Sequence, residues 1–200
     1  MPVKYLKHLP KAHLHLHLEG AMRPATLTEF CARYKIERPS DTRGQQFSNF
    51  TAFNEVYRAA SDSIRTKQDL ARVVLEVAED AAKDGANWIE LAFDADRYTI
   101  LRADRSLRLF ETPYEGWLFA LEAARNASEK TGVGISFISA IDRTRPIEQA
   151  NERAKLTSNL ISSQKHQITA KNINGGEPYA GIIGLGLHGN EEGYPPEIFA

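Results

Sequence analysis

The sequence predicts an α/β fold in which parallel strands alternate with helices. Short apolar or alternating segments recur along the chain, and each is followed by a segment whose apolar residues repeat with helical periodicity. Strands that alternate with helices of this length are typical of βαβ units, whose strands run parallel in one sheet. The 200 residues, 42% of them hydrophobic, suit one domain or part of a larger one.

The first unit begins with the segment AHLHLHL (12–18), whose strict alternation is typical of a strand. The segment RPATLTEFCARY (23–34) follows and is predicted to be a helix, because Pro24 suits a first helical turn. The stretch RPSDTRGQQFSN (38–49) is predicted to be an irregular connection.

The second unit contains the clearest helix, TKQDLARVVLEVAEDAAKDG (66–85). Its apolar residues recur at helical spacing, and Thr66 is predicted to cap its first turn. Asp69 stands three residues later and completes an imperfect capping box, since Glu or Gln is usual there. Gly85 suits the end of the helix, and Trp88–Phe93 follows as a short apolar strand.

Two further units repeat the same order. A predicted helix at 114–132 leads to a strand at 133–141, and a helix at 146–161 leads to a strand at 180–187. The polar stretch SSQKHQITAKNINGGEP (162–178) between the last two is the best candidate for a flexible loop.

Composition limits the partners of the protein. The chain has 25 Lys+Arg and 26 Asp+Glu, and a net charge of −1 does not indicate a surface for nucleic acid or anionic membranes. The single cysteine, Cys31, excludes an internal disulfide, fits a reducing compartment and is most simply a small buried side chain. Lysines and prolines interrupt the first eleven residues, so they contain no apolar signal-peptide core. We therefore expect a cytoplasmic protein.

The segment PKAHLHLHLEG (10–20) places three histidines at two-residue spacing. In a regular strand, His13, His15, His17 and Glu19 share one face. The opposite, apolar face carries Leu14, Leu16 and Leu18. If helices cover the apolar face, the histidines point into the interior of a parallel barrel, whose C-terminal mouth is where chemistry is placed.

Two imidazoles at this spacing can converge on one metal ion, and imidazole suits a zinc-like metal. His15 and His17 are the predicted ligands. His13 lies deeper in the strand, where we expect a packing or supporting role. The alternative is a half-exposed strand whose polar face happens to be histidine.

Three segments together resemble one known family. They are LPKAHLHLHLEGAMRPATLTEF (9–30), SNFTAFNEVYRAASDSIRTKQDLARVVLEVAEDAAKDGANWIELAFDA (48–95) and GIIGLGLHGNEEGYPPEIF (181–199). In order, they resemble the opening, the lid-helix region with the second strand, and the fourth strand of the adenosine deaminase family.

The resemblance implies a TIM-type (β/α)8 barrel of the metal-dependent hydrolase kind. It implies hydrolytic, zinc-dependent deamination of adenosine or a related 6-aminopurine, a small-molecule purine being the substrate. His15 and His17 match the two metal ligands of the first strand. Glu19 matches the acid that contacts the ribose hydroxyls, and Gly189 matches the turn glycine whose N–H meets the purine ring.

Several residues depart from the family pattern and leave the particular 6-aminopurine open. His13 stands where the family usually has Glu, and Ala92 stands where Arg is common. Gly186 and His188 stand where many adenosine deaminases have Asp and Ala.

The family's third metal histidine and its acid/base glutamate belong to a fifth strand, which we expect beyond Ala200. Residues 1–200 are therefore predicted to form the N-terminal part of one barrel domain, about four strands of eight. Such a half barrel leaves a sheet edge open, and the missing half could be another chain. The alternative function is a non-catalytic, truncated half barrel that acts as a metal-binding or interaction module.

Other motifs admit two interpretations. The segment HGNE (188–191) imitates the missing His-x-x-Glu motif, but its flanking residues fit the fourth-strand turn better. The segment GLGLHG (184–189) satisfies a dinucleotide fingerprint literally, yet no helix pattern follows it, so we reject that interpretation. The segment IDRTRP (141–146) fits a solvated strand-to-helix turn better than a basic substrate contact.

Aromatic residues also gather between residues 47 and 57. An apolar gate over the purine and ordinary helix packing are equally compatible with their spacing. The residues concerned are Phe47, Phe50, Phe53 and Tyr57.

Overall fold

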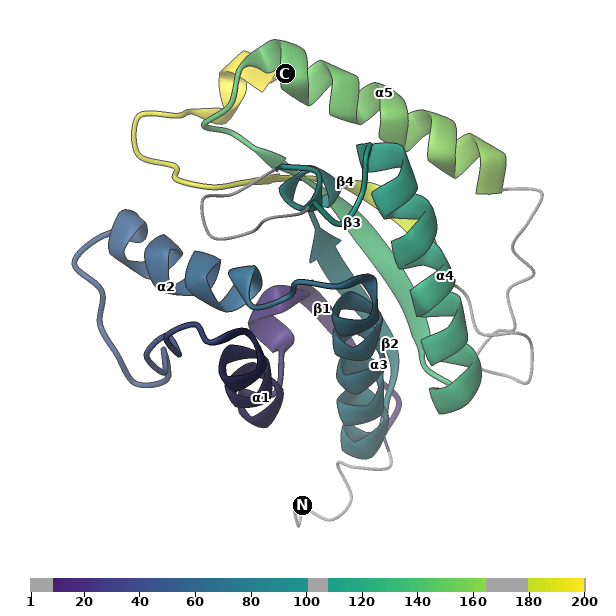
Figure 1. The fold of residues 1–200 in the computed structure, drawn as a ribbon. Coiled ribbons are helices and arrows are strands. Elements are labelled where there is room, and N and C mark those ends of the chain that lie inside the picture. The colour runs from purple at the N-terminus through teal and green to yellow at the C-terminus, as the bar shows by residue number, and fades with distance from the viewer. Residues whose placement is uncertain (1–8, 101–107, 165–179, 200) are drawn as a thin grey trace.

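The computed structural model describes residues 9–100, 108–164 and 180–199. Its centre is a sheet of four parallel strands that lie in chain order, as Figure 1 shows. The strands are β1 (Lys11–His17), β2 (Ala86–Phe93), β3 (Gly134–Asp142) and β4 (Ala180–His188). The predicted α/β class with parallel βαβ units is confirmed.

Five helices connect and cover the strands. They are α1 (Pro24–Tyr34), α2 (Phe50–Asp62), α3 (Lys67–Asp84), α4 (Pro113–Thr131) and α5 (Ile147–Gln164). Helices α3, α4 and α5 follow one face of the sheet, whereas α2 lies beyond β1 on the opposite side from α4 and α5 (Figure 1). Short 3-10 turns follow β1 (Glu19–Ala21) and β2 (Ala95–Tyr98), and a third turn lies at Pro196–Phe199.

Local sequence signals set several of the helix boundaries. Helix α1 begins at Pro24, and Cys31 is buried within it, both as predicted. Both halves of the capping box at Thr66 and Asp69 form at the start of α3, so Asp completes the motif in spite of its shorter side chain. Gly85 ends that helix with a φ of +83°, which glycine adopts without steric cost.

The structure bears on two connections that the sequence predicted to be irregular. The connection at 38–49 has no regular secondary structure, as expected. The predicted flexible loop at 162–178 begins inside α5, which continues to Gln164, and residues 165–178 lie outside the described residues.

The apolar core lies between the sheet and helices α3 and α4. Three aromatic rings form its centre: those of Phe93 and Trp117 are 5.0 Å apart, and that of Phe137 lies 5.9 Å from Phe93. Leu16 and Leu18 of the first strand region pack against the same core. Helices α3 and α4 thus bury the apolar face of the sheet, as an α/β fold requires.

Strand β1 does not alternate regularly, and here the sequence prediction is wrong. The register with β2 shifts between His13 and Leu16, and His15 has a φ of +61°. This extra residue forms a β-bulge, which turns the side chains before it to the other face. The ring of His13 therefore meets Asp84 at the end of α3, with Nε2 3.2 Å from Oδ2. Leu14, predicted to be covered, is 61% exposed.

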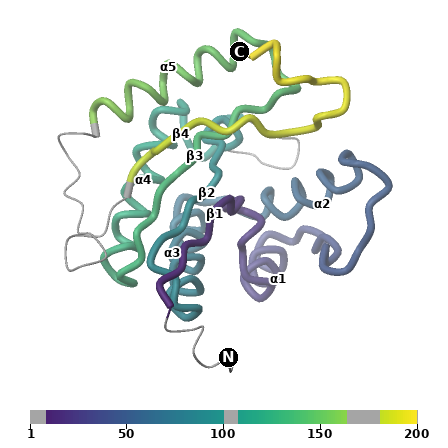
Figure 2. The backbone as a smooth tube through the Cα atoms, turned by 180° about the vertical axis from the view of Figure 1, so that it is seen from behind, coloured from purple at the N-terminus to yellow at the C-terminus, as the bar shows by residue number. Residues whose placement is uncertain are grey.

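The two outer strands of the sheet are β1 and β4, as the view from behind shows (Figure 2). Ile183 and Leu185 on β4 are 44% and 49% exposed. Apolar side chains therefore lie open on an outer strand of the described sheet. No helix in the described residues is both long and apolar enough to span a membrane.

Candidate active site

A cavity of about 860 Å³ opens where the four parallel strands end. Each strand contributes residues to its lining at or just after its carboxyl end. They are His15, His17 and Glu19 from the β1 region, Ala92 and Asp94 from β2, Asp142 from β3, and His188 and Gly189 from β4. In parallel α/β folds, ligands bind at this end of the strands.

His15 and His17 both line this cavity, with ring centres 5.5 Å apart. The bulge at His15 brings the two rings to the same side of the sheet even though His13 points away from it. Burial lowers the pKa of His17, an effect that Glu19 partly opposes and His15 reinforces. A neutral imidazole keeps the lone pair that a metal ion requires.

His188 lies beside these two histidines. Its ring centre is 5.0 Å from that of His17 and 5.9 Å from that of His15. Burial, together with the two neighbouring imidazoles, lowers its pKa to about 4. In the sequence, His188 belongs to the HGNE segment, which was interpreted as a turn after the fourth strand. The pairing of β4 with β3 in the structure is what places its ring beside His15 and His17.

Glu191, the acid of the HGNE segment, lines the cavity and forms an ion pair with Arg143. Its Oε1 accepts a hydrogen bond from Nη2 of Arg143 at 3.0 Å. Arg143 belongs to the turn between β3 and α5, which forms at IDRTRP as predicted. The prediction that this turn is solvated is wrong for Arg143, which is only 7% exposed because its guanidinium packs against the segment after β4.

Glu19 is buried beneath the mouth, with 4% of its surface exposed. One carboxylate oxygen accepts a hydrogen bond from the hydroxyl of Tyr57 and the other from that of Tyr98, both at 2.7 Å. Burial, together with the neighbouring carboxylate of Glu19, raises the pKa of both tyrosine hydroxyls. Tyr98 was missed at the sequence level because it stands 79 residues from Glu19 and no local motif joins them.

The aromatic residues around α2 form a row that leads to the histidines. Phe47 and Phe53 have ring centres 5.6 Å apart, Phe53 and Tyr57 6.3 Å, and Tyr57 and His17 6.0 Å. Phe50 and Phe53 are each 39% exposed and line the cavity. These two rings therefore lie at the cavity and outside the apolar core.

Gly189 occupies a position that tolerates no side chain. Its φ is +100°, and a Cβ there would lie 2.8 Å from Oδ1 of Asp142. The chain therefore turns tightly at the end of β4, which leaves the backbone of Gly189 on the lining of the cavity.

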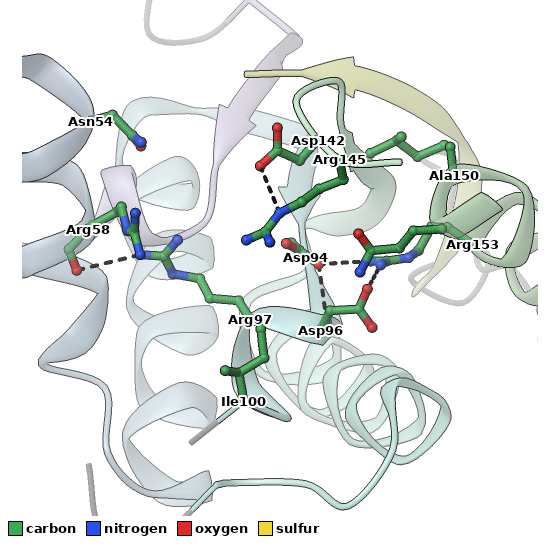
Figure 3. A pocket seen from close by; sticks show the side chains of 12 residues that line it. Asn54, Arg58, Asp94, Asp96, Arg97, Ile100, Asp142, Arg145, Ala150 and Arg153 are labelled. Atoms are coloured by element: carbon green, nitrogen blue, oxygen red, sulfur yellow. Dashed lines mark hydrogen bonds and ion pairs between the residues drawn. The ribbon is translucent and has the colours of Figure 1, made fainter. Parts of the chain in front are cut away.

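A smaller, polar cavity of about 120 Å³ adjoins the first and shares Asn54, Asp94, Arg97 and Asp142 with it. Figure 3 shows Arg153 reaching Asp94 and Asp96, which follow β2. Burial raises the pKa of Asp94, although Arg153 opposes this effect. These acids were not singled out from the sequence, although they stand where a strand ends, in the segment FDAD.

The donor set fits a zinc-like ion only in part. Imidazole nitrogens suit such a metal, and His15 and His17 lie close enough to share one. In the part of the chain that the structure describes, no group of three histidine, cysteine or carboxylate side chains could hold a metal ion. A complete coordination shell therefore needs further residues.

Comparison with known families identifies the chain. Residues 10–200 match the family model described as adenosine deaminase. The chain belongs to the adenosine deaminase family. This match confirms the resemblance inferred from the sequence.

Individual relatives agree with this assignment. An adenine deaminase of Vibrio parahaemolyticus is 30% identical over 98% of the chain, which covers 52% of that protein. The crystal structure of an adenine deaminase from Arthrobacter aurescens has a TM-score of 0.67 and 25% identity, over 95% of this chain and 52% of that one. An amidohydrolase structure from Burkholderia ambifaria, described with bound Zn, has a TM-score of 0.61 and 20% identity. The match covers 98% of this chain and 48% of that one.

The chain thus spans about half the length of the relatives it matches. Its four parallel strands with their helices form half of a TIM-type barrel, which confirms the predicted fold class.

Proposed function

We propose that the whole protein, of which residues 1–200 form the N-terminal half of a barrel domain, hydrolytically deaminates a 6-aminopurine. The observation that carries the proposal is the pair of imidazoles, His15 and His17, on the lining of the cavity where the strands end. Membership of the adenosine deaminase family supports it.

In this proposal His15 and His17 hold a zinc ion. When bound, such a metal lowers the pKa of a coordinated water, so that hydroxide is available near neutral pH. The low pKa of His17, caused mainly by burial, favours the neutral imidazole needed for binding. The remaining ligand and the acid/base residue of the family pattern are expected from the second half of the barrel.

We also propose substrate contacts for Glu19 and Gly189. The backbone N–H of Gly189 faces the purine ring, because its turn leaves the main chain at the cavity surface. Glu19 acts on the ribose side and keeps Tyr57, and with it the aromatic row of α2, in place over the mouth. The row of Phe50, Phe53 and Tyr57 then covers one face of the purine.

The substrate is a small-molecule purine, and no nucleic acid or membrane takes part. The open strands β1 and β4 would be covered by the second half of the barrel, which completes the hydrogen bonding of the sheet. The single buried thiol of Cys31 agrees with a cytoplasmic location.

The test uses the complete protein together with the 200-residue chain. The complete protein, purified with zinc, should release ammonia from at least one of adenine, adenosine and AMP, and a chelator should abolish the release. His15→Ala should remove both activity and metal. His13→Ala is the matched control, because its ring faces Asp84 outside the cavity, and it should keep both.

The 200-residue chain alone should not deaminate adenosine, because two histidines without an acid/base group leave proton transfer unsupported. Chelator-sensitive turnover by this chain would contradict that expectation, and Glu191→Gln would then test the HGNE motif. A complete protein that binds zinc but turns over none of the three purines would favour the non-catalytic alternative.

A further inference from the structure

Arg143 carries a charge that is almost completely buried where β3 ends. The residue is 7% exposed and directly follows Asp142, the last residue of the strand. Its Nε is buried and has no hydrogen-bond partner in the described part of the chain. A buried donor without a partner costs folding free energy, so stability alone does not account for an arginine at this position.

Three other polar groups of Arg143 hold the end of β4 and the segment after it, residues 189–194, which we call the β4 turn. Its backbone N–H donates a hydrogen bond to the carbonyl of His188 at 2.9 Å. Nη2 donates to Oε1 of Glu191 at 3.0 Å, and Nη1 donates to the carbonyl of Tyr194 at 3.3 Å. One side chain thus fixes both the middle and the end of the β4 turn.

The beginning of the β4 turn lies against the same residue. A Cβ at Gly189 would lie 3.6 Å from Cγ of Arg143 and 2.8 Å from Oδ1 of Asp142. Asp142 is itself fixed, because Oδ1 accepts hydrogen bonds from N and Oγ1 of Thr144 at 2.9 and 2.7 Å. The backbone of Gly189 therefore packs on the aliphatic stem of Arg143 and on the carboxylate of Asp142.

The sheet by itself does not hold the β4 turn. Strand β4 is an outer strand, so among the described strands only β3 pairs with it. The register of the two strands ends at the pair Asp142 and His188, directly before the β4 turn. Arg143 is the next residue on the β3 side, so its side chain holds the chain where backbone pairing stops.

We propose that Arg143 is a positioning residue for the purine site, which holds the β4 turn so that the backbone N–H of Gly189 keeps its place at the cavity. The inference rests on the proposed contact between Gly189 and the purine. The lining of the cavity includes Gly189 and Glu191 but not Arg143. Arg143 therefore acts on the ligand through the β4 turn and does not touch it.

The experiment compares the complete protein with its Arg143→Lys variant on whichever of adenine, adenosine and AMP is deaminated fastest. Lysine keeps the charge but lacks the guanidinium fork that joins Glu191 to Tyr194. The Gly189 contact binds the purine ring equally in the ground state and the transition state. KM should therefore rise by about three- to tenfold, the value of one hydrogen bond, while kcat stays within about twofold. The affinity for unsubstituted purine, measured by calorimetry, should fall by the same factor.

A second measurement follows the amide of Gly189 directly by NMR in protein that contains isotope-labelled glycine. Arg143→Lys should shift this signal and lower its heteronuclear NOE, because the β4 turn loses attachments. Arg72→Lys is the matched control. Arg72 also pairs with carboxylates, those of Glu29 and Glu76, but it does not line the cavity. The control should leave KM and the Gly189 signal unchanged.

A change at Glu191 tests the same ion pair without disturbing a buried side chain. Glu191 is exposed, and Glu191→Gln weakens the ion pair while it keeps an acceptor oxygen. KM should rise less than it does in Arg143→Lys. The double variant should behave like Arg143→Lys, because residues that act through one contact are not additive. Fully additive effects would contradict the proposed coupling.

The outcomes separate this inference from the proposed function. If Arg143→Lys lowers the melting temperature but leaves KM and the Gly189 signal unchanged, its role is structural and the inference is refuted. A fall in kcat at constant KM would refute it as well, since Arg143 would then act on the reacting groups. If the complete protein binds purine but deaminates none of the three substrates, the proposed function fails, and the purine affinities still decide the role of Arg143. If it binds no purine, both are wrong.

Discussion

The two sides of β1 belong to regions of very different character. On the helix side, Leu16 and Leu18 join a core in which Trp117, Phe93 and Phe137 are almost fully buried and pack ring against ring. On the cavity side, imidazoles and a buried carboxylate meet around a large open volume. Strand β1 itself contains a bulge, at which His15 has a positive φ and its ring lines the cavity.

The difference shows how this chain separates stability from chemistry. Regular helices and strands bury apolar surface efficiently, and this burial stabilises the folded state. The cavity side instead keeps a left-handed histidine and a half-buried imidazole cluster, which cost folding free energy and are retained where a site is needed. Substitutions on the two sides should therefore affect different measurements.

The largest effect is expected from Trp117→Ala in the core. Trp117 is fully buried, and its removal leaves a cavity among Phe93 and Phe137. The free energy of unfolding should fall by about 3–5 kcal/mol. Urea unfolding measures the loss, and the zinc affinity of the folded fraction should stay unchanged. A loss below about 1 kcal/mol would contradict the description of this side as the stabilising one.

A smaller loss is expected from Glu19→Gln beneath the cavity. The amide nitrogen of glutamine cannot accept a hydrogen bond, so one of the hydroxyls of Tyr57 and Tyr98 loses its partner. Unfolding free energy should fall by about 1–3 kcal/mol. Zinc binding should persist, since Glu19 is not a proposed ligand. Loss of the metal would show that the ligands are assigned wrongly.

The bulge is tested by comparing His15→Gly with His15→Ala. Both remove the imidazole, but only glycine adopts a φ of +61° without steric cost. In the metal-free chain, the glycine variant should be more stable than the alanine variant by about 1 kcal/mol. Equal urea midpoints for the two variants would argue against a left-handed backbone at this position.

The smallest effect is expected on the helix side, at the surface pair that joins α1 to α3. Asp80 accepts hydrogen bonds from Nε and Nη2 of Arg23 at 2.8 and 2.7 Å. Chiefly because of these bonds, the pKa of Asp80 is lowered from its ordinary value of 3.8. At pH 7, Asp80→Asn should cost less than about 1 kcal/mol.

The pH dependence of this cost follows from the lowered pKa. An acid whose pKa is lower in the folded state stabilises that state above the unfolded value of 3.8 and ceases to do so as pH falls through the folded value. The difference between Asp80→Asn and the unmodified chain should therefore vanish in strong acid. A difference that is constant from pH 7 to pH 2 would exclude the ion pair as its cause.

Local signals in the sequence predict most of this fold. Pro24, the Thr66–Asp69 capping box and Gly85 act within one turn of the residues they influence, so the sequence alone reveals them. Apolar patterning likewise predicts the four strands and the helices that correspond to α1, α3, α4 and α5, whereas α2 was not predicted from it. The bulge at His15 escaped prediction because its cause is the pairing of β1 with β2, which strict alternation in one strand does not report.

The sequence by itself determined the α/β class and the family, and it predicted His15 and His17 as metal ligands, since each rests on motifs or periods contained in single segments. Only the tertiary structure decided that His13 turns to Asp84, that Glu19 is enclosed by Tyr57 and Tyr98, and that His188 joins the other two rings. The physical reason is distance along the chain. These contacts join residues that only the packing of separate strands and helices brings together, and no local propensity encodes them.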